Sequence, residues 1–97
     1  MRLRFTDQAT EDLAAIADYI LPRSPVGARH VRDDILASAR TLTHWPDIGR
    51  RQKVEGVRKL VTRRYQYLIY YAFDKAADEV LILAIRHPAR DREYSDA

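Results

Sequence analysis

The sequence predicts an α+β domain in which a helical hairpin covers one face of an antiparallel sheet. Three apolar runs rich in β-branched and aromatic residues follow one another between positions 56 and 87, separated by short polar segments, which indicates a meander of antiparallel strands. Two stretches with apolar residues at helical spacing precede these runs. With one short alternating segment at the start, the expected order is β-α-α-β-β-β in two layers.

The composition is that of one small globular domain over residues 1–97. Hydrophobic residues make up 46% of the chain and charged residues 32%, and 97 residues can bury one modest core but not two. No apolar run approaches the roughly 18 residues that would suggest a membrane span. The absence of cysteine excludes a disulfide framework and a thiolate metal site. We therefore expect a cytoplasmic protein with no membrane partner and no cofactor.

The first strand and first helix are predicted from alternation, a cap and helical spacing. In the segment Arg2–Phe5, alternation places Leu3 and Phe5 on the inward side. Thr6 is a favourable N-cap for a helix that Pro22 would end. The apolar face of this helix consists of Ala9, Leu13, Ile16, Ala17 and Ile20.

The second helix begins with a strong start signal. Ser24 can act as its N-cap and Pro25 suits the first helical position. Its apolar face consists of Ala28, Val31, Ile35, Ala39 and Leu42. Pro46 closes it, so we expect a helix of about 20 residues and roughly 30 Å. The apolar sides of the two helices can then cover one face of the sheet together.

The three strand runs differ in their expected burial. They cover Gly56–Val61, Tyr65–Tyr71 and Val80–His87, with a hairpin connection at 74–78 between the last two. The second and third runs are apolar on both alternating faces and should lie centrally, whereas charges in the first run place it closer to an edge. The partner of the first strand stays open. The predicted core between the hairpin and the sheet contains Leu13, Ile16, Val31, Ile35, Ile69, Leu81 and Leu83.

Positive charge is concentrated in one segment. The net charge is only +3, but residues 50–64 contain seven cations and one acid, Glu55, so this segment carries +6 and the rest of the chain −3. The cations are Arg50, Arg51, Lys53, Arg58, Lys59, Arg63 and Arg64. Such a patch indicates a polyanionic partner, either nucleic acid or an acidic protein segment. The alternative interpretation is that this segment is only a solvated loop and edge strand, with no polyanionic partner.

The residues that could bind a ligand or take part in catalysis form no complete catalytic pattern. His30, His44 and His87 show no metal-ligand spacing, and the first two suit exposed or capping positions on the second helix. His87 follows directly on a buried strand, where a functional and a structural histidine are equally expected. Four tyrosines could stack on bases beside the arginines, although packing in the core is the favoured interpretation. These tyrosines are Tyr65, Tyr67, Tyr70 and Tyr71.

Several short patterns occur in an order that resembles a known family. They are Ala9-x-x-Asp12-Leu13-x-x-Ile16-x-x-Tyr19-Ile20, Pro46-x-x-Gly49-Arg50, Gly56-Val57-Arg58, Tyr67-Leu68-Ile69-Tyr70-Tyr71 and Ile82-Leu83-Ala84-Ile85-x-His87-x-x-Arg90. In this order and spacing, over about 85 residues, they resemble the RelE/ParE superfamily of toxins of type II toxin–antitoxin systems. The resemblance implies a helical hairpin on an antiparallel sheet and a cognate antitoxin as partner, with a toxin–antitoxin hetero-oligomer.

The superfamily has two activities, and the resemblance to the ribonuclease branch is incomplete. RelE-like members cut mRNA in the ribosome with arginines, lysines and a tyrosine. Of the positions in that pattern, Arg58 and Tyr94 match, whereas Leu60, Tyr67 and Pro88 do not. Some ribonuclease branches use histidine, so an alternative catalytic set stays open. It consists of Arg58, His87, Arg90 and Tyr94.

The ParE-like branch resembles the chain better, in the helical hairpin and in the strand Tyr67–Tyr71. The resemblance implies that the protein poisons DNA gyrase, arrests growth and stabilises plasmids without catalysing a reaction, and that its site is a binding surface. The expected binding residues are Arg58, Lys59, Arg63, Arg64, Arg86, His87 and Arg90. The alternatives are a ribosome-dependent mRNA endonuclease and a non-toxic member that acts only in a repressor complex with its antitoxin.

Overall fold

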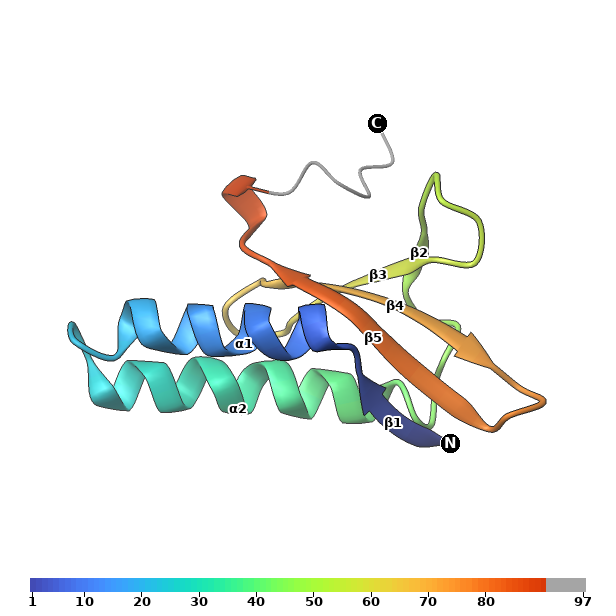
Figure 1. The fold of residues 1–97 in the computed structure, drawn as a ribbon, viewed down its shortest axis with the longest axis horizontal. Helices are drawn as coiled ribbons and strands as arrows, with labels where there is room; N and C mark the ends of the chain where they lie inside the picture. The colour runs from blue at the N-terminus through green and yellow to red at the C-terminus, as the bar shows by residue number, and fades with distance from the viewer. Residues whose placement is uncertain (91–97) are drawn as a thin grey trace.

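Two helices lie against one face of a twisted sheet in the computed structural model, which describes residues 1–90 (Figure 1). The elements are β1 (Arg2–Phe5), α1 (Asp7–Ile20), α2 (Pro25–Thr41), β2 (Arg50–Arg51), β3 (Arg58–Val61), β4 (Leu68–Asp74), β5 (Glu79–Arg86) and a 3₁₀ turn at Pro88–Arg90. The predicted α+β fold with a helical hairpin on a sheet is confirmed. None of the helices within residues 1–90 is long and apolar enough to cross a membrane.

The sheet has five strands in the order β1-β5-β4-β3-β2. β3, β4 and β5 form the predicted antiparallel meander, with β4 and β5 in interior positions. The sheet as a whole is mixed, because β1 pairs in parallel with β5, from Arg2 opposite Glu79 to Phe5 opposite Ile82. β2 is a further strand that the sequence did not predict, and its two residues pair antiparallel with Arg58 and Lys59 of β3.

Both helices begin at the predicted caps. The Thr6 hydroxyl accepts a hydrogen bond of 3.1 Å from the Ala9 N–H, and the Ser24 hydroxyl accepts one of 2.9 Å from the Gly27 N–H. α2 has 17 residues and ends at Thr41. It is therefore shorter than predicted, because the residues before Pro46 form turns.

The main core lies between the helical hairpin and the sheet. Its buried members are Ala9, Val31, Ile35, Ala39, Leu42, Ile69, Tyr71, Val80, Ile82 and Ile85. The prediction is confirmed for Val31, Ile35 and Ile69, and Leu13 and Ile16 pack against this cluster partly buried. The long apolar face of α2 and the inward side of β4 and β5 therefore supply most of the burial that stabilises the domain.

The placement of Leu81 and Leu83 in this core was wrong, because both are only partly buried. Leu81 alternates with Val80 and Ile82, which face the helices, so it points to the opposite side. Leu83 is the extra residue of a β-bulge: Tyr70 lies opposite Ala84 and Tyr71 opposite Ile82, which leaves Leu83 without a partner. Leu83, two residues after Leu81, keeps the same side by alternation and packs on the far side of the sheet. The bulge shifts the alternation only beyond Leu83, so Ala84 also lies on the far side and Ile85 faces the helices.

A smaller apolar cluster covers part of that far side. It contains the buried residues Val57, Leu68, Tyr70 and Ala84, with Leu83 packed against them. Tyr70 here and Tyr71 in the main core are fully buried, which confirms the core interpretation for these two tyrosines. Tyr67 is partly buried, whereas Tyr65 is exposed.

Candidate functional site

The predicted binding residues lie in three parts of the fold, and those in the first part are divided between the two faces of the sheet. Arg58 and Lys59 are neighbours in β3 but point to opposite faces, since Arg58 lies opposite Tyr71 of the main core and Lys59 opposite Tyr70 of the far-side cluster. The Arg63–Arg64 pair follows β3 and lies beside α2. The third place is the end of β5, with Arg86 and His87 and the turn that contains Arg90. Tyr94 lies outside the described residues.

Arg58 holds a loop rather than extending into open solvent. Its Nη1 donates to the carbonyl oxygens of Asp47 at 3.0 Å and Gly49 at 2.8 Å. Tyr71 fixes the same loop, because its hydroxyl donates to the Pro46 carbonyl at 2.6 Å and accepts from the Gly49 N–H at 2.9 Å. A Cβ at Gly49 would lie 2.5 Å from the Tyr71 oxygen, so only glycine fits. Burial raises the pKa of Tyr71 above its ordinary value, which keeps this hydroxyl protonated.

The Arg63–Arg64 turn is fastened to α2 by Asp34. The Asp34 carboxylate accepts hydrogen bonds from the N–H groups of Arg64 (3.1 Å) and Tyr65 (3.0 Å) and from the Thr62 hydroxyl. Burial by itself raises the pKa of Asp34, but these three hydrogen bonds and the charge of Arg64 outweigh it, so the pKa lies below its ordinary value. Asp34 is only 6% exposed. The turn is therefore held in one conformation by a buried, ionised carboxylate.

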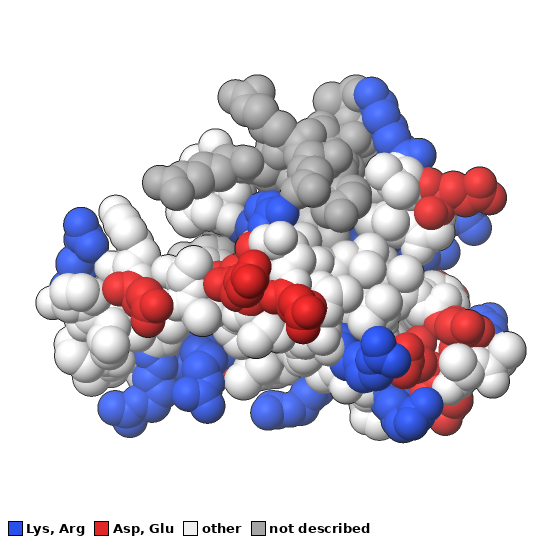
Figure 2. All heavy atoms as spheres, viewed as in Figure 1, with Lys and Arg blue, Asp and Glu red and all other residues white. Residues whose placement is uncertain are grey.

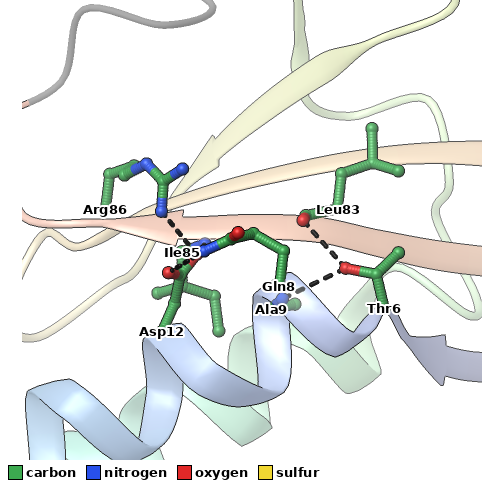
Figure 3. Close-up of polar contacts among 7 residues, drawn as sticks. All are labelled: Thr6, Gln8, Ala9, Asp12, Leu83, Ile85 and Arg86. Carbon is green, nitrogen blue, oxygen red and sulfur yellow. Dashed lines mark hydrogen bonds and ion pairs between the residues drawn. The ribbon is translucent and has the colours of Figure 1, made fainter.

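Thr6 joins the start of α1 to the bulge in β5 (Figure 3). Its hydroxyl caps α1 and also donates to the Leu83 carbonyl at 2.9 Å, while its N–H donates to the Ile82 carbonyl at 3.0 Å. β1 stops at this point, so no strand of the described part of the chain lies beside the rest of the β5 edge. The edge beyond Ile82 is covered by α1 instead.

Asp12 completes that cover at the end of β5 (Figure 3). Its Oδ2 accepts hydrogen bonds from the Ile85 N–H at 2.9 Å and from Arg86 Nη1 at 2.5 Å. Gln8 donates to the other carboxylate oxygen at 2.8 Å. The side chains of Asp12 and Arg86 are 11% and 21% exposed, so this is a partly buried ion pair. It ties the predicted residue Arg86 to the first helix.

A groove of about 530 Å³ opens beside this ion pair, between α1 and the end of β5. Tyr19, Tyr67, Arg86 and His87 are among its lining residues. The rings of Tyr67 and His87 meet edge to face, with centroids 5.6 Å apart and planes at 86°. The Ala89 N–H donates to His87 Nδ1 at 3.1 Å, and the His87 ring is exposed. Burial raises the pKa of Tyr67 above its ordinary value.

Two carboxylates position predicted binding residues in the described part of the chain. Within residues 1–90, no three His, Asp or Glu side chains are placed to hold a metal ion. Sequence reasoning missed the roles of Asp12 and Asp34, which position Arg86 and the Arg63–Arg64 turn. A usable signal existed for Asp34: at helical spacing it borders the apolar face, three residues after Val31. A carboxylate there needs partners from another element.

Comparisons with known proteins agree on one group. The model of a family described as the ParE toxin of the type II toxin–antitoxin system parDE matches residues 3–92. A solved structure of the chromosomal ParDE toxin–antitoxin system from P. aeruginosa is similar with a TM-score of 0.77 and 29% identity, over 90% of this chain and 95% of that chain. The toxin–antitoxin complex RelBE2 from Mycobacterium tuberculosis is similar in fold, with a TM-score of 0.65 and 24% identity over 89% and 95% of the two chains. No curated protein matches the chain.

Proposed function

The chain belongs to the ParE toxin family of type II toxin–antitoxin systems, and from this premise we propose that it inhibits DNA gyrase and is neutralised by a cognate antitoxin. In this proposal the toxin acts in the cytoplasm by binding, without catalysing a reaction of its own. Growth arrest follows from blocked replication, and a plasmid or chromosomal segment carrying the pair is maintained because only the antitoxin keeps the toxin inactive.

One observation carries the choice of binding over RNA cleavage. Arg58 and Leu60, two residues apart in β3, are the first and second basic positions of the ribonuclease pattern. Leu60 packs against the main core opposite Ile69, and Arg58 donates to two loop carbonyls on the same side. A phosphate cradle needs open, converging cations, and each preorganised donor of this kind contributes about 10²–10³ in rate. This face supports no such cradle.

The open edge of β3 supports an antitoxin as partner. β2 pairs only with Arg58 and Lys59, so within residues 1–90 no strand lies beyond Leu60 and Val61, and Val61 is 47% exposed. An exposed edge of this kind accepts an added strand from another chain. The +6 charge of residues 50–64 favours an acidic or amphipathic antitoxin segment.

Inducing the toxin without its antitoxin tests the cellular activity. We expect growth arrest with DNA-damage signalling and trapped gyrase–DNA complexes, while mRNA stays intact within coding regions. Because Tyr94 would matter only for cleavage, Tyr94→Phe should leave toxicity unchanged. Primer extension showing cuts at codon positions, lost in Arg58→Ala, would contradict the proposal.

Titration calorimetry with the product of the neighbouring gene tests the antitoxin. We expect nanomolar affinity for the wild type and weaker binding for Val61→Lys, which places a charge on the open edge. Val54→Lys is the matched control, because Val54 is 46% exposed but lies in the loop between β2 and β3. Equal weakening by both substitutions would contradict binding along the β3 edge.

A ribosome-dependent endonuclease is the second candidate, and one observation favours it. The exposed His87 lies in the groove with Tyr67 and Arg86, so an imidazole, a phenol and a cation are close together. This candidate would replace the first if the wild type cut mRNA at codon positions and His87→Ala abolished both these cuts and toxicity.

A further inference from the structure

Five exposed arginines lie on α2 and on the turn fastened to it. We define them as the arginine face: Arg29, Arg32, Arg40, Arg63 and Arg64. The turn lies beside α2, because a shallow hollow of about 400 Å³ is lined by α2 residues together with Arg63 and Arg64. Figure 2 shows acidic side chains along α1 and basic side chains along the lower border, where α2 lies in Figure 1. In this view the helical layer therefore has an acidic side along α1 and a basic side along α2.

No ion pair within residues 1–90 uses the arginine face. The ion pairs there join the N-terminus to Asp78, Arg2 and Arg4 to Glu79, and Arg86 to Asp12. Even when Asp33 and Asp34 are both counted, the arginine face and its acids keep an excess of three positive charges. Arg64 interacts electrostatically with Asp34, but the excess of cations remains, and concentrated cations of this kind attract a polyanion.

The turn that carries two of these arginines is preorganised. Asp34 accepts hydrogen bonds from the N–H groups of Arg64 and Tyr65 and from the Thr62 hydroxyl. The Thr62 oxygen in turn accepts one from the Tyr67 N–H at 3.0 Å. The backbone of Arg63 and Arg64 therefore needs little further ordering when a ligand binds. Arginine suits phosphate, because its planar fork can donate two hydrogen bonds to one phosphate group.

We propose that the arginine face binds the phosphate backbone of duplex DNA without reading its sequence. Arg29 and Arg40 are eleven residues apart on one helix, or about 16 Å at the α-helical rise, which spans several phosphates of a duplex. Single strands are bound by rows of aromatic side chains, and the arginine face offers only Tyr65 beside Arg64. This inference deepens the proposed function, on which its cellular setting rests, by assigning the arginine face to the DNA that gyrase holds.

Fluorescence anisotropy of a labelled 20-base-pair duplex of arbitrary sequence, titrated with the full chain at several salt concentrations, tests the assignment. Arg63→Ala with Arg64→Ala should weaken binding about tenfold and reduce the slope of log K against log salt by about 1.8, the value for two lost phosphate contacts. Arg2→Ala with Arg4→Ala removes the same charge from the β1 edge and is the matched control, expected to leave the slope unchanged. Circular dichroism checks that both double variants are folded.

Equal loss in the two double variants, or no measurable duplex binding by the wild type at low salt, would overturn the assignment. Displacement of the duplex by a poly-glutamate peptide at lower concentration than by unlabelled duplex would assign the arginine face to an acidic protein instead. Gyrase is absent from this assay. If the wild type bound DNA normally but did not inhibit gyrase, only the proposed function would be contradicted. If the Arg63→Ala, Arg64→Ala variant inhibited gyrase as strongly as the wild type, only the role assigned to the arginine face would be contradicted.

Discussion

Replacing Asp34 by alanine should destabilise the domain by about 3 kcal/mol, because it removes the acceptor of three hydrogen bonds in a site that is only 6% exposed. A hydrogen bond to a charged group contributes about 1.5–3 kcal/mol, which would give a larger sum. Arg64 and Tyr65 are exposed, however, so water can reach part of the opened turn and offset some of the loss. The remaining cost of about 3 kcal/mol is a large fraction of the free energy of unfolding of about 5–15 kcal/mol that is typical of such domains.

The same carboxylate predicts a pH dependence. The pKa of Asp34 lies below its ordinary value of 3.8, so the folded state favours the ionised form. Its contribution to the free energy of unfolding is complete above the unfolded-state pKa and is lost as pH falls from there through the folded-state pKa. The stability difference between the wild type and Asp34→Ala should therefore be full at pH 7 and shrink below about pH 4.

Urea unfolding followed by circular dichroism measures both effects. Thr62→Val and the double variant with Asp34→Ala complete a mutant cycle, and we expect a coupling of about 1 kcal/mol between the two residues. Asp34→Asn is the matched control for shape, and its loss of charge should still destabilise the turn. A cost below about 0.5 kcal/mol at pH 7, or a cost that does not change down to pH 3, would refute the assigned role of Asp34.

Three further substitutions probe other parts of the fold by urea unfolding. Ile69→Ala should cost about 2–5 kcal/mol, because Ile69 is fully buried in the main core, and an unchanged midpoint would contradict its placement. Tyr71→Phe should cost about 1–3 kcal/mol, because the buried Gly49 N–H loses its acceptor, and a neutral effect would contradict that role. Asp12→Ala should cost about 3 kcal/mol and increase hydrogen exchange at the Ile85 N–H, whereas unchanged exchange would contradict the edge cover.

Local signals in the sequence predicted the helices and the meander. Thr6 and Ser24 begin helices because their side chains satisfy the first free N–H groups, and this interaction spans only three residues. The parallel pairing of β1 with β5 joins residues 77 apart, and no local pattern encodes it. The bulge at Leu83 was missed for the same reason, since alternation within β5 gives no sign that a partner strand is one residue shorter.

The sequence suggested which residues could form a binding site but not how they are arranged in the fold. A run of basic residues suggested one patch, yet β3 alternates, so Arg58 and Lys59 separate to opposite faces. This part follows from the period of a strand and could have been predicted. The attachment of Arg58 to the loop carbonyls, and of the Arg63–Arg64 turn to Asp34, depends on how helix, loop and sheet meet. Such tertiary contacts cannot be deduced from spacing alone.

A cleavage assay with purified DNA gyrase tests the central claim most directly. Supercoiled plasmid, ATP and gyrase are incubated with increasing amounts of the toxin, and the reaction is stopped with detergent and protease so that trapped double-strand breaks appear as linear DNA. We predict linear DNA that increases with toxin concentration and disappears when the cognate antitoxin is added first. Unchanged gyrase activity at every toxin concentration, with codon-position cuts in mRNA on purified translating ribosomes under the same conditions, would contradict the claim.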